Sequence, residues 1–159
     1  YRKLCVLKDI VAEYNESIPV DKRDRITGPN DAAALLYMVL KGKPVEECWA
    51  LYINNAGRVL RRMKLTFGGL TQTVIDVQTI LRNAIYLSAT GIILAHNHPS
   101  GDPKPSKADI KATDDLQKAA SCIGIRLQDH IIISDSCYYS FSDKCTNAYD
   151  KDLVRKLLQ

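Results

Sequence analysis

Two histidines stand two residues apart at the end of an apolar run, and their type and spacing suit them to hold a metal ion. The run covers residues 91–95 and is followed directly by His96 and His98. In an extended chain, residues i and i+2 project to the same side, so both imidazoles can reach one ion. Asp109 lies in the first turn of the next predicted helix and can add a carboxylate. Two imidazoles and one carboxylate leave a fourth position for water, which is typical of a catalytic zinc site.

A simpler interpretation competes for two residues of this segment. Ser106 and Asp109 fit a capping box, Ser-x-x-Asp, which stabilises the start of a helix and needs no metal. A His-x-His pair alone is only a weak indication, because polar residues also stand at strand ends for other reasons. The whole spacing, His-x-His-x7-Ser-x-x-Asp, favours the metal site. Ser106 is able to serve both as a cap and beside the ion.

The remaining histidine and two familiar motifs need separate treatment. His130 follows Asp129 within a predicted strand, and we interpret it as a hydrogen-bonded structural residue rather than a ligand. Asn97 points to the other side of the strand from its neighbours, so we expect it to be structural. The letters His-Asn-His do not indicate an HNH nuclease, whose residues are dispersed over a ββα motif. A zinc deaminase needs His-x-Glu with Pro-Cys-x-x-Cys, and this sequence has neither.

The elements that must position these residues alternate irregularly between helix and strand. Helices are predicted over residues 32–40, 77–89 and 106–122, with starts at Pro29 and Asp76 and stops at Gly42 and Gly124. Strands are predicted over residues 48–53, 58–67, 91–95, 125–127, 129–134 and 138–141, and a turn at 54–57 joins the first two into a hairpin. This order predicts an α/β fold of mixed (α+β) type, with a sheet flanked by helices.

The composition is that of an ordinary globular domain. The chain has 159 residues, 46% hydrophobic and 25% charged, which suits one domain with its own core. Its net charge of +4 permits weak attraction to an acidic partner but does not identify a nucleic-acid binder. The cysteines are odd in number and include no Cys-x-x-Cys pair, so we expect reduced thiols in a cytoplasmic protein. No apolar run approaches membrane-spanning length.

The histidine segment and its flanks resemble the RadC family of JAMM (MPN+) metallohydrolases. The spacing given above matches the JAMM signature at every fixed position, and the runs at 93–101, 105–109 and 125–132 resemble RadC proteins further. The resemblance covers residues 29–142. It leaves an N-terminal arm or peripheral helix at 1–28 and a C-terminal tail with a short helix at 143–159. It implies a JAMM/MPN-type, cytidine-deaminase-like architecture with a central mixed β-sheet.

The resemblance also implies a catalytic glutamate near the start of the first hairpin strand, where Glu46 and Glu47 are both candidates. Strand alternation places Glu46 on the face of Cys48, and Glu47 on the face of Trp49. Aligning the hairpin turn at residues 54–59 with that of the family favours Glu46. Glu47 is the alternative, one residue out of register.

The site roles follow from this resemblance. His96, His98 and Asp109 would hold one zinc ion per chain, which lowers the pKa of its bound water from 15.7 to about 7. Glu46 would accept the proton of that water and pass it to the leaving amine. Ser106 would hydrogen-bond the oxyanion or the water. The implied function is a zinc-dependent peptidase or isopeptidase, with the peptide or protein substrate not identified.

The alternative function is a DNA-associated accessory protein, in keeping with the DNA-repair label of the RadC family, in which the metal is structural or vestigial. A structural site would be closed and would need no general base. A basic cluster on the returning strand bears on this alternative; its members are Arg58, Arg61, Arg62 and Lys64. We interpret the cluster as a solvated face, with a phosphate-binding edge as the other interpretation. Nothing in the sequence indicates a membrane partner or an oligomeric state.

Overall fold

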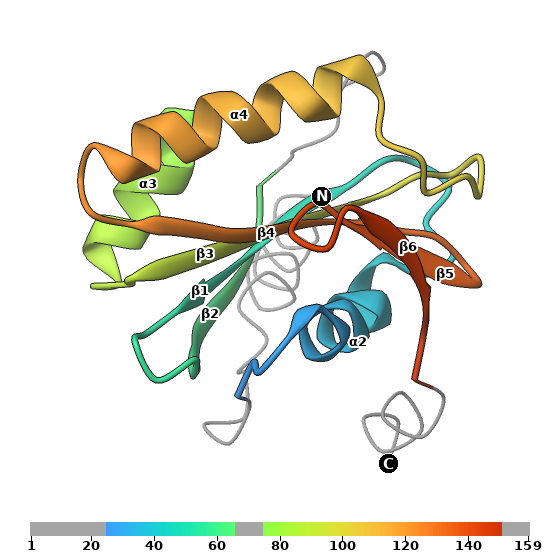
Figure 1. Ribbon diagram of the computed structural model, residues 1–159, viewed down its shortest axis with the longest axis horizontal. Helices are drawn as coiled ribbons and strands as arrows, with labels where there is room; N and C mark the ends of the chain where they lie inside the picture. Colours follow the sequence, from blue (N-terminus) through green and yellow to red (C-terminus); the bar gives the residue numbers. More distant parts are fainter. Residues whose placement is uncertain (1–24, 66–74, 151–159) are drawn as a thin grey trace, which may run out of the picture.

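The computed structural model describes residues 25–65 and 75–150 (Figure 1). The described helices are α2 (Pro29–Leu40), α3 (Val77–Tyr86) and α4 (Lys107–Ser121). The described strands are β1 (Cys48–Ile53), β2 (Val59–Lys64), β3 (Gly91–Asn97), β4 (Arg126–Ile133), β5 (Cys137–Ser140) and β6 (Cys145–Ala148). Most of the predicted arm at 1–28 and the predicted helix near the C-terminus lie outside the described residues.

The strands form one mixed sheet in the order β2-β1-β3-β4-β5-β6. β3 and β4 are parallel, and every other neighbouring pair is antiparallel. Parallel neighbours need a crossover connection, which α4 provides between β3 and β4. Figure 1 shows α3 and α4 on one face of the sheet and α2 on the other. The predicted fold, a central mixed sheet flanked by helices, is confirmed and is consistent with the JAMM/MPN-type architecture that the resemblance implies.

Alternation along the central strands divides the core between the two faces. Ile92 and Leu94 of β3 pack in a cluster with residues of α3 and α4. Ile93 and Ala95 pack in a second cluster, with the buried side of α2. Because successive side chains of a strand point to opposite faces, His96 continues the α3/α4 face. We call this side the histidine face and the α2 side the asparagine face, after the next residue, Asn97.

The helix predicted over residues 77–89 ends earlier, at Tyr86. Asp76 caps its start as predicted, by accepting from two backbone N–H groups of the first turn. Its end is closed by Ser88, whose φ of 53° is left-handed and whose N–H bonds back to the last turn. Glycine usually marks such an end, as Gly124 does with a φ of 73° after α4. A serine in that place gives no comparable sequence signal.

Two differences concern the last strands. The short strands predicted over residues 125–127 and 129–134 form a single strand, β4, whose pairing with β3 shifts register at Gln128. A bulge of this kind interrupts the alternation by which strands are predicted. β6 lies in the predicted tail; it is mostly exposed and so shows no apolar alternation.

Within residues 25–65 and 75–150, no helix is long and apolar enough to cross a bilayer.

Candidate metal centre

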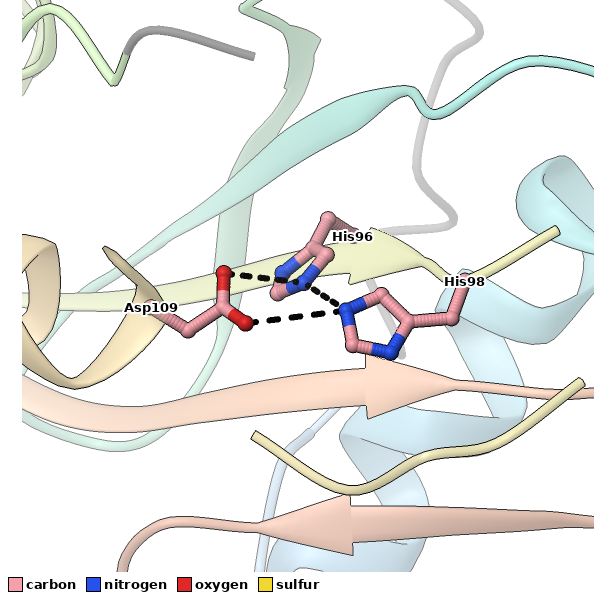
Figure 2. Close-up of side chains that lie close together, drawn as sticks. All are labelled: His96, His98 and Asp109. Carbon is pink, nitrogen blue, oxygen red and sulfur yellow. Dashed lines mark hydrogen bonds and ion pairs between the residues drawn. The ribbon is translucent and has the colours of Figure 1, made fainter. Parts of the chain in front are cut away.

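The fold brings His96, His98 and Asp109 together, and their side chains point toward one another (Figure 2). His96 ends β3 on the histidine face, His98 follows it in the loop, and Asp109 lies in the first turn of α4. The Nε2 atoms of His96 and His98 lie 2.9 Å apart. The Asp109 oxygens lie 3.3 Å from Nε2 of His96 and 3.6 Å from Nε2 of His98.

These separations fit a small divalent cation. A tetrahedral zinc ion with ligands at about 2.0–2.1 Å holds them about 3.3 Å from one another. The observed spacings, 2.9 to 3.6 Å, bracket that value. Among the described residues, this trio is the group of His, Cys, Asp and Glu side chains whose ligand atoms converge closely enough for an ion. The donor set therefore suits zinc.

Hydrogen bonding sets which nitrogen of His98 faces the centre. Its Nδ1 lies 2.7 Å from the backbone carbonyl of Asp102. A carbonyl can only accept, so Nδ1 carries the proton and, in the neutral ring, Nε2 presents a lone pair. The turn that allows this contact has Gly101 at a φ of 81°, with its N–H donating to the His98 carbonyl. The Gly101 conformation thus orients His98.

The burial and charges of His96, His98 and Asp109 favour a positive charge between their side chains. Burial lowers the pKa of His96 to about 4, so its ring is neutral at pH 7. Burial alone would raise the pKa of Asp109, but its bonds to His98 and Ser106 outweigh this and hold it well below the usual range. The same bond to Asp109 raises the pKa of His98. Without a metal, a proton on His98 interacts favourably with Nε2 of His96 and the carboxylate of Asp109. A bound ion would replace that proton.

The predicted capping box is present and shapes the centre. The Ser106 hydroxyl accepts from the backbone N–H of Asp109 at 3.1 Å, and the Asp109 carboxylate accepts from the backbone N–H of Ser106 at 2.8 Å. The cap therefore orients the carboxylate toward the histidines, and the two interpretations of this segment are compatible. Ser106 uses its oxygen as the acceptor here, which leaves its proton to be donated.

Glu47 is committed to the asparagine face. Its side chain is buried, lies 3.0 Å from the Lys64 ammonium, and accepts from the Trp49 indole N–H at 3.1 Å. Its backbone N–H donates to the side-chain oxygen of Asn97 at 2.8 Å. Burial alone would raise the pKa of this carboxyl, but the bonds to Lys64 and Trp49 prevail and lower it. Glu47 is thus a paired structural carboxylate.

Glu46 is exposed and lies two residues before the start of β1. Cys48 of β1 pairs with His96, and the backbone pairing continues through Glu47 and Asn97. Extended by one more residue, the same register would set Glu46 opposite His98. The negative charge of Glu46 also contributes, as the smallest of several causes, to the raised pKa of His98. The structure therefore separates the two glutamates: Glu47 is buried and paired, whereas Glu46 is exposed and acts electrostatically on His98.

Two other residues deserve placing. Asn97 is structural as predicted, because its amide donates to the carbonyls of Val45 at 3.1 Å and Lys43 at 3.4 Å. His130 is hydrogen-bonded as predicted, but its partner is His96, at 2.9 Å between Nε2 and Nδ1. Sequence reasoning missed this contact, because only the parallel pairing of β3 and β4 brings the rings together.

The basic cluster is partly used inside the protein. Arg62 donates to the backbone carbonyl of Leu35 in α2 at 3.2 Å, and Lys64 pairs with Glu47. Arg58 and Arg61 are exposed. Half of the cluster therefore packs against the asparagine face.

Comparison with known proteins gives one consistent result. A family model described as the RadC-like JAB domain matches residues 26–146. A UPF0758 protein of Porphyromonas gingivalis is 40% identical over 136 residues, which are 83% of this chain and 60% of that protein. A UPF0758 protein of Flavobacterium johnsoniae is 37% identical over 123 residues, which are 77% of this chain and 54% of that protein. The chain thus spans little more than half the length of these relatives.

Proposed function

The chain belongs to the RadC-like JAB domain family, and on that premise we propose that it is a zinc-dependent hydrolase of peptide or isopeptide bonds. JAB domains are often zinc metallohydrolases. The observation that carries the proposal is the convergence of His96, His98 and Asp109 on one point that demands positive charge. The set supplies three ligands and leaves a fourth position, as catalytic rather than structural zinc sites do.

The chemistry divides between the ion and the side chains. Zinc, when bound, would supply a Lewis acid and a water molecule of lowered pKa. Glu46, which is exposed and whose charge acts on His98, would take the proton of that water and return it to the leaving amine. Ser106, at the start of α4, would donate its hydroxyl proton to the carbonyl oxygen that becomes negative as the water attacks.

A peptidase screen of zinc-loaded protein tests the proposal. Wild type and Glu46→Gln would be compared on linear peptides and on isopeptide-linked substrates, with zinc content measured in the same samples. Gln keeps the size of the side chain and removes its basicity. We expect wild type to release amine from at least one substrate, and Glu46→Gln to retain zinc while losing at least about a hundredfold in rate.

Two outcomes would overturn the proposal. If Glu46→Gln hydrolyses the substrate as fast as wild type, the general-base mechanism fails. If Glu46→Gln loses its zinc, the carboxylate is a ligand, and the centre is closed rather than catalytic. The second result would make the DNA-associated protein with a structural metal the better account, whereas the first would require a group other than Glu46 as the base.

A further inference from the structure

We propose that Thr113 and His130 are positioning residues that hold His96 in the tautomer whose Nε2 presents its lone pair to the metal. The inference rests on the metal centre of the proposed function, but not on which bond the protein cleaves. It concerns three hydrogen bonds that run from α4 through β4 to β3. Metal ligands of this kind commonly depend on the partner of their second ring nitrogen.

The direction of the chain of hydrogen bonds is fixed at Thr113. Its hydroxyl donates to the backbone carbonyl of Asp109, one helical turn earlier, at 2.6 Å. A carbonyl cannot donate and a hydroxyl has one proton, so that proton is used in this bond. The same Thr113 oxygen lies 2.6 Å from Nδ1 of His130. It must therefore accept there, and Nδ1 of His130 carries a proton.

The assignment passes from His130 to His96. A neutral imidazole has one N–H and one lone pair, so His130 presents a lone pair at Nε2. That atom lies 2.9 Å from Nδ1 of His96, which must then donate. His96 is left with its lone pair on Nε2, the atom that faces His98 and Asp109. Each ring is thus set by the one behind it.

Burial makes the opposite arrangement costly. His130 is fully buried and His96 is 2% exposed, so water does not compensate for a lost hydrogen bond. His130 is shielded from water, and a charged ring is costly to bury, so the ring is neutral. Reversing both tautomers would turn the Nδ1 lone pair of His130 toward the Thr113 oxygen. A buried polar group left in this way loses its hydrogen bond without replacement.

Packing fixes the His130 ring as well. It stacks on the ring of Phe141 with centroids 4.8 Å apart and planes 8° from parallel. Asp109 contacts both ends of this chain of hydrogen bonds. Its backbone carbonyl accepts from Thr113, and its carboxylate faces His96. The first turn of α4 therefore supplies a ligand and, through Thr113 and His130, orients another.

Matched variants of Thr113 test the proposal. Thr113→Val keeps the shape and removes the hydroxyl, whereas Thr113→Ser keeps the hydroxyl. Zinc affinity would be measured by competition with a chromophoric chelator, a reading that needs no substrate. We expect Thr113→Val to bind zinc about 10- to 100-fold more weakly than wild type and Thr113→Ser to restore most of the affinity. Circular dichroism checks that each variant is folded.

A spectroscopic measurement reads the tautomers directly. The chain has three histidines, all at this centre, so ¹H–¹⁵N correlation of the imidazoles gives few signals to assign. In the zinc-bound wild type we expect His96 and His130 both to carry their proton on Nδ1. Should Thr113→Val fail to fold, His130→Leu in the affinity assay and the wild-type spectrum still decide the matter.

Two results would overturn the proposed roles of Thr113 and His130 and leave the peptidase proposal standing. One is a folded Thr113→Val that binds zinc as tightly as wild type; the other is a zinc-bound wild type in which His96 carries its proton on Nε2. Conversely, a protein that shows the predicted tautomers and affinities but cleaves no peptide would support the roles of Thr113 and His130 and contradict the hydrolase proposal.

Discussion

The two faces of the sheet at the end of β3 carry neighbouring buried polar residues with opposite environments. Asn97, on the asparagine face, accepts from the Glu47 N–H and donates to two backbone carbonyls. His96, on the histidine face, donates through Nδ1, but its Nε2 faces another imidazole nitrogen and a carboxylate. Donors meet acceptors around Asn97, whereas acceptors meet one another around His96.

This difference shows that burial of a polar side chain does not by itself mark a site. A buried group whose partners complement it stabilises the fold. A set of buried acceptors aimed at one point needs a positive charge from outside, either a proton or a metal ion. Variants on the histidine face should therefore affect metal binding and hydrolysis, and variants on the asparagine face should affect stability.

The largest effect is expected from removing the two imidazoles. Wild type should bind about one zinc per chain, and His96→Ala combined with His98→Ala should bind none, because one carboxylate cannot hold the ion alone. Metal analysis after dialysis measures this. Stoichiometric zinc in the double variant would contradict the ligand assignment.

The two glutamates should separate cleanly in activity. Glu46→Gln is expected to lose at least about a hundredfold in hydrolysis, while Glu47→Gln on the opposite face should change the rate by less than about threefold. Steady-state rates on one substrate give both numbers. The reverse result would mean that the strand register is off by one residue, which moves every side chain to the other face.

Metal removal should weaken the fold without undoing it. The two apolar clusters form a core that does not involve the ion. An ion at a hundred times its dissociation constant stabilises the folded state by about 2.7 kcal/mol. A chelator should therefore lower the melting temperature and leave the circular dichroism at room temperature unchanged. Loss of secondary structure on chelation would show that metal binding and folding are one event.

Asn97→Ala should cost stability and leave zinc in place. It removes the acceptor of the Glu47 N–H and the donor to two carbonyls, so we expect a loss of about 2 kcal/mol in the free energy of unfolding. Urea titration measures the loss, and metal analysis checks the centre. An Asn97→Ala protein that is stable but has lost its zinc would place Asn97 with the site rather than the scaffold.

Glu47→Gln should show the smallest effect, about 1 kcal/mol at pH 7, because Gln keeps a hydrogen bond to Trp49 but loses the charge. The folded pKa of Glu47 lies below its ordinary value, so its stabilising contribution is present above about pH 4.5 and is lost as the pH falls through the folded pKa. The difference between wild type and variant should shrink from pH 7 to pH 3. A difference that grows on acidification would have the wrong sign.

Much of this architecture could be predicted from local sequence. β1 has the predicted bounds. α4 begins after Ser106 and ends before Gly124, because serine at a helix start and glycine at a left-handed helix end are recognisable in the sequence. The end of α3 was missed because Ser88 takes the place of glycine. The bulge at Gln128 and the polar strand β6 were missed because neither follows a two-residue period.

The candidate site divides in the same way. His96, His98 and Asp109 follow from strand and helix geometry over a short stretch of sequence, and the structure brings them together. The contact of His130 with His96 and Thr113 spans three elements, so no local pattern contains it. The separation of Glu46 from Glu47 follows from alternation, but the pairing of Glu47 with Lys64 on β2 comes only from the fold.

X-ray absorption at the zinc edge of the loaded wild-type protein tests the central claim most directly. The histidine face should give two imidazole nitrogens and two oxygens at about 2.0–2.1 Å, from His96, His98, Asp109 and one water. A sulfur at about 2.3 Å would bring in Cys48, which pairs with His96 on β1. A third imidazole would make His130 a ligand. Either finding would contradict the account of a three-residue centre with an open position.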